Sequence, residues 1–273
     1  MINKSKLFVS ALGVMFAMTM GQNVAAQNFP PMGGAPGMAP AAGAQARPAQ
    51  PGQGAPQMGM GMRQPVTFEK TDITPYFTAS TAKPATPDKE GFIRRWTLLE
   101  PITKPNRSNT VFTDSYIRTE FAKPYFQNQM TILPKNGDKV TVDGKELVWH
   151  ALDSKLYNVK LFRFATSLEN AERYGILFWA VTVVNCTEDI ENVRMAVGSN
   201  SASMWWLNGE EAVILSGDRR MVADDAVSKR ITLKKGKNVI RGAVINGPGM
   251  SDFCLRFIDE KGEPVKNITI TNE

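Results

Sequence analysis

The sequence predicts an all-β protein whose residues 66–273 fold as an antiparallel β-sandwich with one short helix. Short apolar runs separated by turn residues every eight to twelve positions are typical of such a fold. Asn208-Gly209 lies between two apolar runs and predicts a two-residue hairpin, because both residues tolerate positive φ. The first arm, Met204 to Leu207, is apolar on both faces, so we expect both faces to be covered inside a sandwich.

The first quarter of the chain lacks a fold-forming pattern. Residues 1–26 combine two lysines, a short apolar run and a final Val24-Ala25-Ala26, which predicts a signal peptide cleaved before Gln27. We therefore expect an exported protein, periplasmic or secreted. We expect no membrane span or lipid anchor after cleavage, since no cysteine stands at the cleavage point. Residues 27–65 consist largely of Pro, Gly, Ala, Met and Gln, which predicts a disordered linker.

Turn residues divide the rest of the chain into short strands. Residues 66–77 predict an edge strand, and residues 91–102 predict a strand ended by Pro101, which cannot donate a ladder hydrogen bond. Asp143-Gly144 predicts a further hairpin. The other expected strands cover residues 140–149, 156–164, 176–184, 193–197, 229–233, 237–244, 252–258 and 268–270.

One helix is expected, between the strand of residues 91–102 and the Asp143-Gly144 hairpin. Asp114 or Ser115 can cap its N-terminus, and Pro124 ends or bends it. Its apolar side is formed by Tyr116, Ile117 and Phe121.

Net charge argues against nucleic acid as a partner. The chain carries a formal charge of +6, from 32 basic and 26 acidic residues. Four of the basic residues lie in the first 65 positions, where no acidic residue occurs, so 28 basic residues face 26 acidic ones in the folded part, a net +2. So small an excess does not make the basic surface that nonspecific nucleic-acid binding needs.

The two cysteines, Cys186 and Cys254, lie in separate apolar strands. In an oxidising compartment they could pair, if the two strands are neighbours, or remain two small buried thiols. Two cysteines and one histidine without close spacing predict neither a metal site nor a cofactor.

The order of motifs resembles the galactose-binding-like jelly-roll modules found beside bacterial secreted esterases, glycosidases and peptidases. The resemblance covers residues 92–270 and implies a jelly-roll sandwich. Many relatives carry two acidic residues where this chain has Ser199-Asn200-Ser201, which weakens any carry-over of a calcium or polar ligand role. The motifs are Arg95-Trp96-Thr-Leu-Leu-Glu-Pro-Ile, Leu147-Val-Trp149, Val197-Gly198-Ser199, Trp206-Leu-Asn208-Gly209, Leu233-Lys-Lys-Gly-Lys-Asn238 and Leu255-Arg256-Phe257 with Asp259-Glu-Lys-Gly262.

Catalytic patterns are weak in this sequence. His150 is the sole histidine and no Gly-x-Ser-x-Gly motif occurs, so a Ser-His-Asp hydrolase would depend entirely on His150. Two carboxylates could flank a glycosidic bond, but nothing separates the candidates from a solvated loop face. Those candidates are Glu210, Glu211, Asp218, Asp224, Asp225 and Asp252. We expect no catalytic residue.

A binding site requires fewer specific residues than a catalytic site. Sugars are held by an aromatic face and by planar polar groups that bind hydroxyls. If Trp206 packs in the core, Trp205 shows an edge at the surface; alternatively, Trp205 covers the outer sheet face beneath the helix. Trp96, Trp149 and Trp179 are expected in the core. The candidate ligand residues, from Trp205 and two polar loops, are Trp205, Asp218, Arg219, Arg220, Asn246 and Asp252.

The sequence therefore favours an exported, non-catalytic module that binds a polysaccharide or supports machinery that acts on one. Two alternatives remain open. The domain could be a structural module that contacts another envelope protein without glycan affinity. It could also be the non-catalytic remnant of a secreted esterase or glycosidase.

Overall fold

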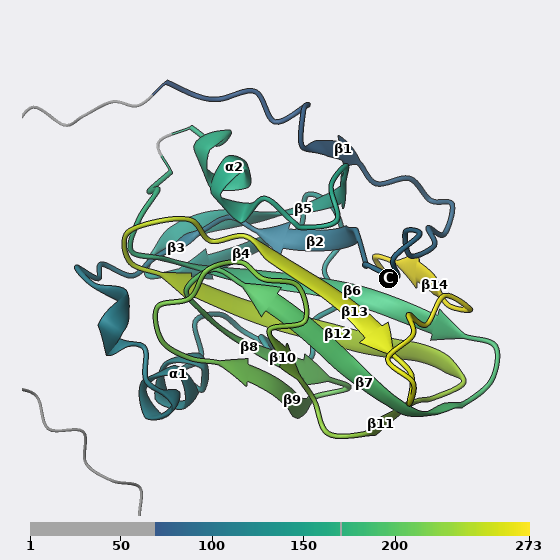
Figure 1. Ribbon diagram of the computed structural model, residues 1–273. Helices are drawn as coiled ribbons and strands as arrows, with labels where there is room; N and C mark the ends of the chain where they lie inside the picture. Colours follow the sequence, from purple (N-terminus) through teal and green to yellow (C-terminus); the bar gives the residue numbers. More distant parts are fainter. Residues whose placement is uncertain (1–68, 170) are drawn as a thin grey trace, which may run out of the picture. The chain divides into compact units, whose positions relative to one another are not determined.

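Two antiparallel β-sheets packed face to face form the core of the protein, as the sequence predicts (Figure 1). The computed structural model describes residues 69–169 and 171–273. The predicted signal peptide and linker therefore lie outside the described residues. Within the described residues, none of the helices is long and apolar enough to cross a membrane.

The larger sheet has the strand order β1-β5-β2-β6-β12-β8-β9, and three short strands, β3, β4 and β14, extend it along β5 and β6. Its strands are β1 (Phe77–Ala79), β2 (Arg95–Leu99), β3 (Ile102–Thr103), β4 (Lys139–Val142), β5 (Lys145–Ser154), β6 (Ile176–Cys186), β8 (Ala202–Leu207), β9 (Glu210–Leu215), β12 (Gly236–Asn246) and β14 (Thr269–Thr271). In the smaller sheet, β7 pairs with all three other strands. They are β7 (Ile190–Ser199), β10 (Ala226–Val227), β11 (Ile231–Leu233) and β13 (Phe253–Ile258).

The space between the sheets is filled by the larger hydrophobic cluster. Three aromatic rings meet at its centre: Trp96 lies 5.8 Å from Trp205 and 5.0 Å from Phe253, and Trp205 lies 4.8 Å from Phe253, centroid to centroid. Gly242 on β12 is the cross-strand neighbour of Trp205. A Cβ atom at Gly242 would lie 2.2 Å from the indole, so the ring occupies the space that a side chain would need.

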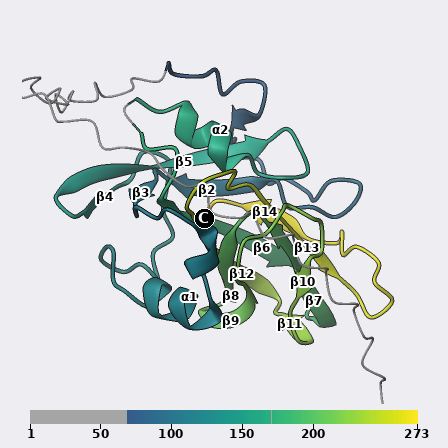
Figure 2. The same ribbon diagram turned by 60° about the vertical axis from the view of Figure 1, so that its left-hand side comes forward.

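A second hydrophobic cluster covers the outer face of the larger sheet. It is closed by helix α1 (Asp114–Phe121), by Phe112, which follows the short 3₁₀ helix η1 (Asn109–Val111), and by the segment that follows α1. Figure 2 shows α1 beside β8. The predicted helix is confirmed, but its N-cap is Thr113 rather than Asp114 or Ser115, because the Thr113 hydroxyl accepts a hydrogen bond from the Tyr116 amide at 3.3 Å.

Both predicted hairpins are confirmed. Asn208 and Gly209 have φ values of 52° and 87°, and Asp143 and Gly144 have values of 48° and 77°. Two positive φ values in succession match the twist of the flanking strands. Other segments differ: of the edge strand predicted for residues 66–77, residues 66–68 lie outside the described residues, residues 69–76 form no strand, and the edge strand β1 is Phe77–Ala79.

Helix α2 (Leu161–Thr166) replaces the end of the strand predicted for residues 156–164. The buried positions Leu161, Phe164 and Ala165 follow the helical i, i+3, i+4 spacing. The residues just before the helix, 155–158, form bends instead of a strand. The strand prediction assumed a two-residue period, whereas the buried positions follow the helical period.

Candidate functional site

The structure brings the two predicted ligand loops together through a residue that the sequence analysis missed. The Asn109 amide donates to Asp218 Oδ1 at 2.8 Å and to the Pro248 carbonyl at 3.0 Å. The Asn109 side-chain oxygen accepts from the Gly247 amide at 2.8 Å. Residues 215–221 and 246–252 therefore meet at one end of the sandwich, where Asn109 joins them.

Most polar groups of these loops are occupied within the protein. Arg219 forms an ion pair with Asp225 at 2.6 Å. Asp252 is buried, pairs with Lys160 at 2.8 Å, and has a raised pKa because of its burial. The Asn246 amide donates to the Gly249 carbonyl at 2.8 Å. Asp218 and Arg220 remain exposed, so this end of the sandwich presents few groups to a ligand.

The structure corrects the expected exposure of Trp205, which is fully buried between the sheets. Its indole N–H donates to Ser203 Oγ at 2.9 Å. The neighbouring Trp206 points the other way and lies beneath α1, 6.4 Å from Phe121. Trp205 thus takes the core position expected for Trp206, and Trp206 takes the position beneath the helix that was considered for Trp205. Trp205 cannot contact a ligand.

A cleft of about 560 Å³ opens beside Trp206, between α1, the segment after it and the outer face of β8. A volume of this size is typical of ligand pockets. Its lining is mainly apolar and is rimmed by polar side chains. The apolar lining comprises Phe121, Ala122, Pro124, Phe126, Met130, Met204 and Trp206, and the polar residues are Arg118, Gln127, Asn128, Gln129 and Thr131.

The floor of this α1 cleft is built from stacked aromatic rings. Trp206 stacks on Trp179 with the centroids 5.7 Å apart and the planes at 15°. The small side chain of Ala243 lies on β12, the strand between them. Phe126 packs edge-on against Trp179, 6.0 Å away. The floor is therefore closely packed, and the exposed fraction of Trp206 is 7%.

The rim carries polar groups with free hydrogen-bonding capacity. Gln127 and Asn128 are exposed, and neither side chain bonds to another described residue. Gln129 instead holds the loop, because its amide donates to the Lys123 carbonyl at 3.1 Å. Arg118 forms an exposed ion pair with Glu211 on β9.

A buried carboxylate fixes the segment after α1. The Glu120 side chain is 5% exposed and pairs with Lys104 at 2.5 Å and with Lys123 at 2.6 Å. The Tyr125 hydroxyl donates to it as well. Burial alone would raise the pKa of Glu120, but these hydrogen bonds outweigh it and lower the pKa to about 2.

Glu120→Gln is expected to lower the free energy of unfolding at pH 7 by about 2–3 kcal/mol. The pKa of Glu120 is depressed in the folded state, so its contribution is present above the ordinary value of 4.5 and is lost as pH falls towards 2. Urea unfolding at pH 7 and near pH 2 measures this. Wild type and variant should converge at the acid end; an equal difference at both pH values would contradict the assignment.

His150 is fixed by a carboxylate. Its Nε2 lies 3.0 Å from Glu100 Oε1, and its ring packs edge-on against Phe164 at 5.4 Å. Among the described residues, no serine, threonine or cysteine side chain hydrogen-bonds to His150. Glu100 also borders a second cleft, of about 620 Å³, whose charged lining includes the exposed pair Lys70–Glu169.

Cys186 and Cys254 are both free and buried. They lie on β6 and β13, in different sheets. Burial raises the pKa of the Cys254 thiol to about 12, which makes it a poor nucleophile. No group of three or more His, Cys, Asp or Glu side chains suited to a metal ion occurs among residues 69–169 and 171–273.

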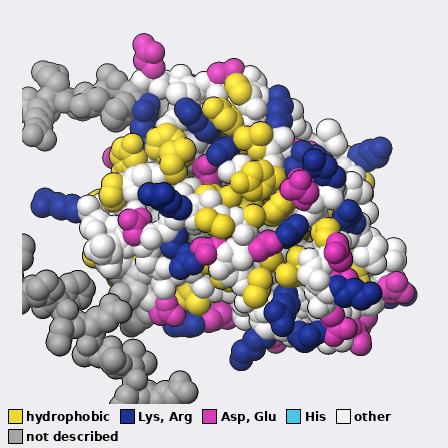
Figure 3. All heavy atoms as spheres, viewed as in Figure 1, with side chains coloured by type: hydrophobic (Ala, Val, Ile, Leu, Met, Phe, Trp, Pro, Cys, Tyr) yellow, Lys and Arg dark blue, Asp and Glu magenta, His cyan; other side chains and the backbone are white. Residues whose placement is uncertain are grey.

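Charges of both signs are distributed over the face of the molecule shown in Figure 3, with apolar side chains gathered in patches between them. This mixture agrees with the small net charge of the folded part.

Neither a family model nor a curated protein sequence matches the chain. Among solved structures, the PA14 domain of the antifreeze protein MpAFP is similar, with a TM-score of 0.41 and 10% sequence identity. The alignment covers 71% of this chain and 95% of that domain. At this distance nothing about ligands or activity transfers from that domain to this chain.

Proposed function

We propose that this protein is an exported, non-catalytic module that binds a carbohydrate chain in the α1 cleft. The observation that carries the proposal is one cleft that combines a closely packed aromatic floor at Trp206 with free amide groups at Gln127 and Asn128. Aromatic rings bind the C–H faces of sugars, and planar amides bind their hydroxyls.

The proposal includes export of the protein and its relation to the galactose-binding-like modules. Export is inferred from the signal-peptide pattern that ends at Ala26, and the relation is inferred from the ordered motifs of residues 92–270. An exported module meets extracellular polysaccharides, which makes a glycan the natural occupant of an aromatic cleft.

Binding of soluble polysaccharides to the full chain, measured by isothermal titration calorimetry, tests the proposal. Gln127→Ala removes one exposed amide at the rim and should weaken binding about two- to tenfold, the value of one net hydrogen bond. The unfolding midpoint should stay unchanged, since Gln127 is exposed and bonds to no other described side chain.

Asn267→Ala is the matched control, because Asn267 is also exposed and does not border the cleft. Its affinity should equal that of wild type. Equal losses for both variants, or the absence of binding across neutral and acidic polysaccharides, would contradict the proposal. The latter result would favour a module that contacts another envelope protein.

A further inference from the structure

The α1 cleft has one charged side chain among its described lining residues, that of Arg118. The other polar lining groups are neutral amides and a hydroxyl, which bind sugar hydroxyls both as donors and as acceptors. They belong to Gln127, Asn128, Gln129 and Thr131. Any discrimination by the cleft between neutral and charged ligands therefore depends on Arg118.

A carboxylate from another strand balances the charge of Arg118. Glu211 lies on β9, opposite Trp206 of β8, and one terminal nitrogen of Arg118 donates to it. Figure 2 shows α1 and β9 side by side. The hydrogen bond from Arg118 to Glu211 raises the pKa of Arg118. The side chains are 47% and 37% exposed, so the pair is accessible to a ligand and has no net charge.

Two further cations lie near the cleft, and neither is among the residues that line it. Lys123 follows the lining residue Ala122 and pairs with the buried Glu120 at 2.6 Å. Arg241 is opposite Trp206 on β12, but it is 3% exposed. The described wall that a ligand meets is therefore electrically neutral.

We propose that the α1 cleft selects neutral glycans, and that Glu211 sets this selectivity through Arg118. This inference rests on the proposed function. An acidic sugar could pair with Arg118 only in place of Glu211, whose carboxylate would then lie beside the acid group of the ligand and repel it. A neutral sugar leaves the ion pair intact. The N–H groups of Arg118 that Glu211 does not occupy can still donate to the hydroxyls of such a sugar.

The first test compares ligands that differ in one kind of group. A cellulose oligomer and a galactan oligomer are titrated into the full chain by calorimetry, each beside a form in which the primary hydroxyls are oxidised to carboxylates. The wild type should bind at least one neutral oligomer more tightly than its oxidised form. A factor of about two to five is expected, the usual size of a charge interaction at an exposed site.

Glu211→Gln isolates the contribution of the ion pair. The variant frees the charge of Arg118, so its affinity for the oxidised oligomer should rise about two- to fivefold. Its affinity for the neutral oligomer should stay within about twofold of the wild-type value. The gain should shrink in about 0.5 M NaCl, because salt screens exposed charges.

Glu210→Gln is the matched control for Glu211→Gln. Glu210 is the preceding residue on β9, is exposed, and forms no ion pair with another described residue. The substitution changes the net charge of the protein by the same amount, but it leaves Arg118 paired. Affinities for all the oligomers should therefore equal those of wild type.

The outcomes separate the two proposals. Equal or tighter binding of the oxidised oligomers by wild type would overturn the selectivity and leave carbohydrate binding intact. An unchanged affinity of Glu211→Gln for the oxidised oligomers, or an equal gain in Glu210→Gln, would overturn the role of Glu211. If none of the oligomers binds, the proposed function fails together with this inference.

Discussion

Trp205→Ala is expected to lower the free energy of unfolding by about 3–5 kcal/mol, the usual cost of emptying a large buried aromatic site. The indole is fully buried and packs against Trp96 and Phe253. The glycine at position 242 leaves the ring its space and offers no side chain to refill the cavity. Guanidinium chloride unfolding followed by circular dichroism measures the loss.

Tyr174→Ala serves as the control for Trp205→Ala, because Tyr174 is an aromatic residue with 51% exposure. Its stability should stay within about 0.5 kcal/mol of wild type. A Trp205→Ala variant as stable as Tyr174→Ala would contradict the central position of Trp205. Any loss of glycan affinity in Trp205→Ala should follow the loss of folded protein.

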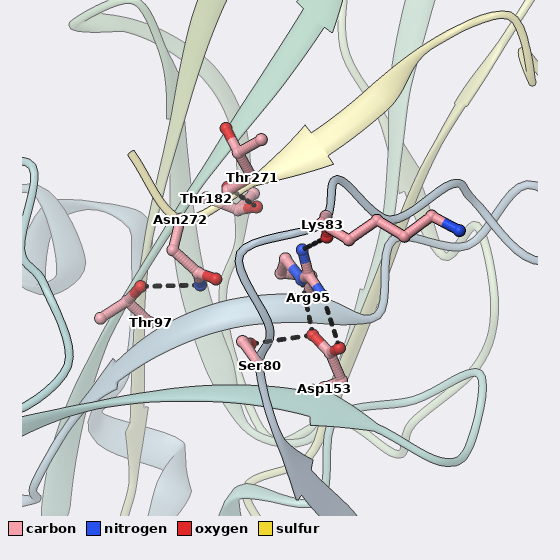
Figure 4. Close-up of polar contacts among 8 residues, drawn as sticks. All are labelled: Ser80, Lys83, Arg95, Thr97, Asp153, Thr182, Thr271 and Asn272. Atoms are coloured by element: carbon pink, nitrogen blue, oxygen red, sulfur yellow. Dashed lines mark hydrogen bonds and ion pairs between the residues drawn. The ribbon is translucent and has the colours of Figure 1, made fainter.

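Asp153→Ala is expected to cost about 3–5 kcal/mol, because it leaves the Arg95 guanidinium buried and unpaired. Asp153 accepts two hydrogen bonds from Arg95 and a third from the Ser80 hydroxyl at 2.9 Å (Figure 4). The Asp153 side chain is itself 27% exposed, so the penalty arises mainly from Arg95. Urea unfolding at pH 7 measures it.

Glu146→Ala is the control for Asp153→Ala. Glu146 pairs with Lys139 at 2.7 Å, and both side chains are 58% exposed. An exposed pair contributes about 1 kcal/mol or less. If Glu146→Ala and Asp153→Ala destabilised the protein equally, the burial of Arg95 would not explain the larger effect expected at Asp153.

The strands and hairpins could be predicted because they depend on local rules. Asn208-Gly209 and Asp143-Gly144 allow positive φ, and apolar runs such as residues 176–184 mark strands covered on both faces. The facing of Trp205 and Trp206 could not be predicted. Alternation places them on opposite faces, but the choice of face depends on the neighbouring strand, where Gly242 lies opposite Trp205 and leaves room for its ring, while Arg241 lies opposite Trp206.

The candidate site could not be predicted from the sequence, because it forms from segments that are far apart along the chain. The cleft exists only when residues 112–132 lie on β8, and Asn109 joins loops more than a hundred residues away.

The larger sheet carries a separate hydrophobic cluster on each of its faces, one shared with the smaller sheet and one with the α1 segment. We expect the α1 layer to open at a lower free energy than the sandwich beneath it. Amide protons of residues 112–132 should then exchange with solvent ahead of those in β6 and β12, and a bound occupant of the cleft should slow that exchange.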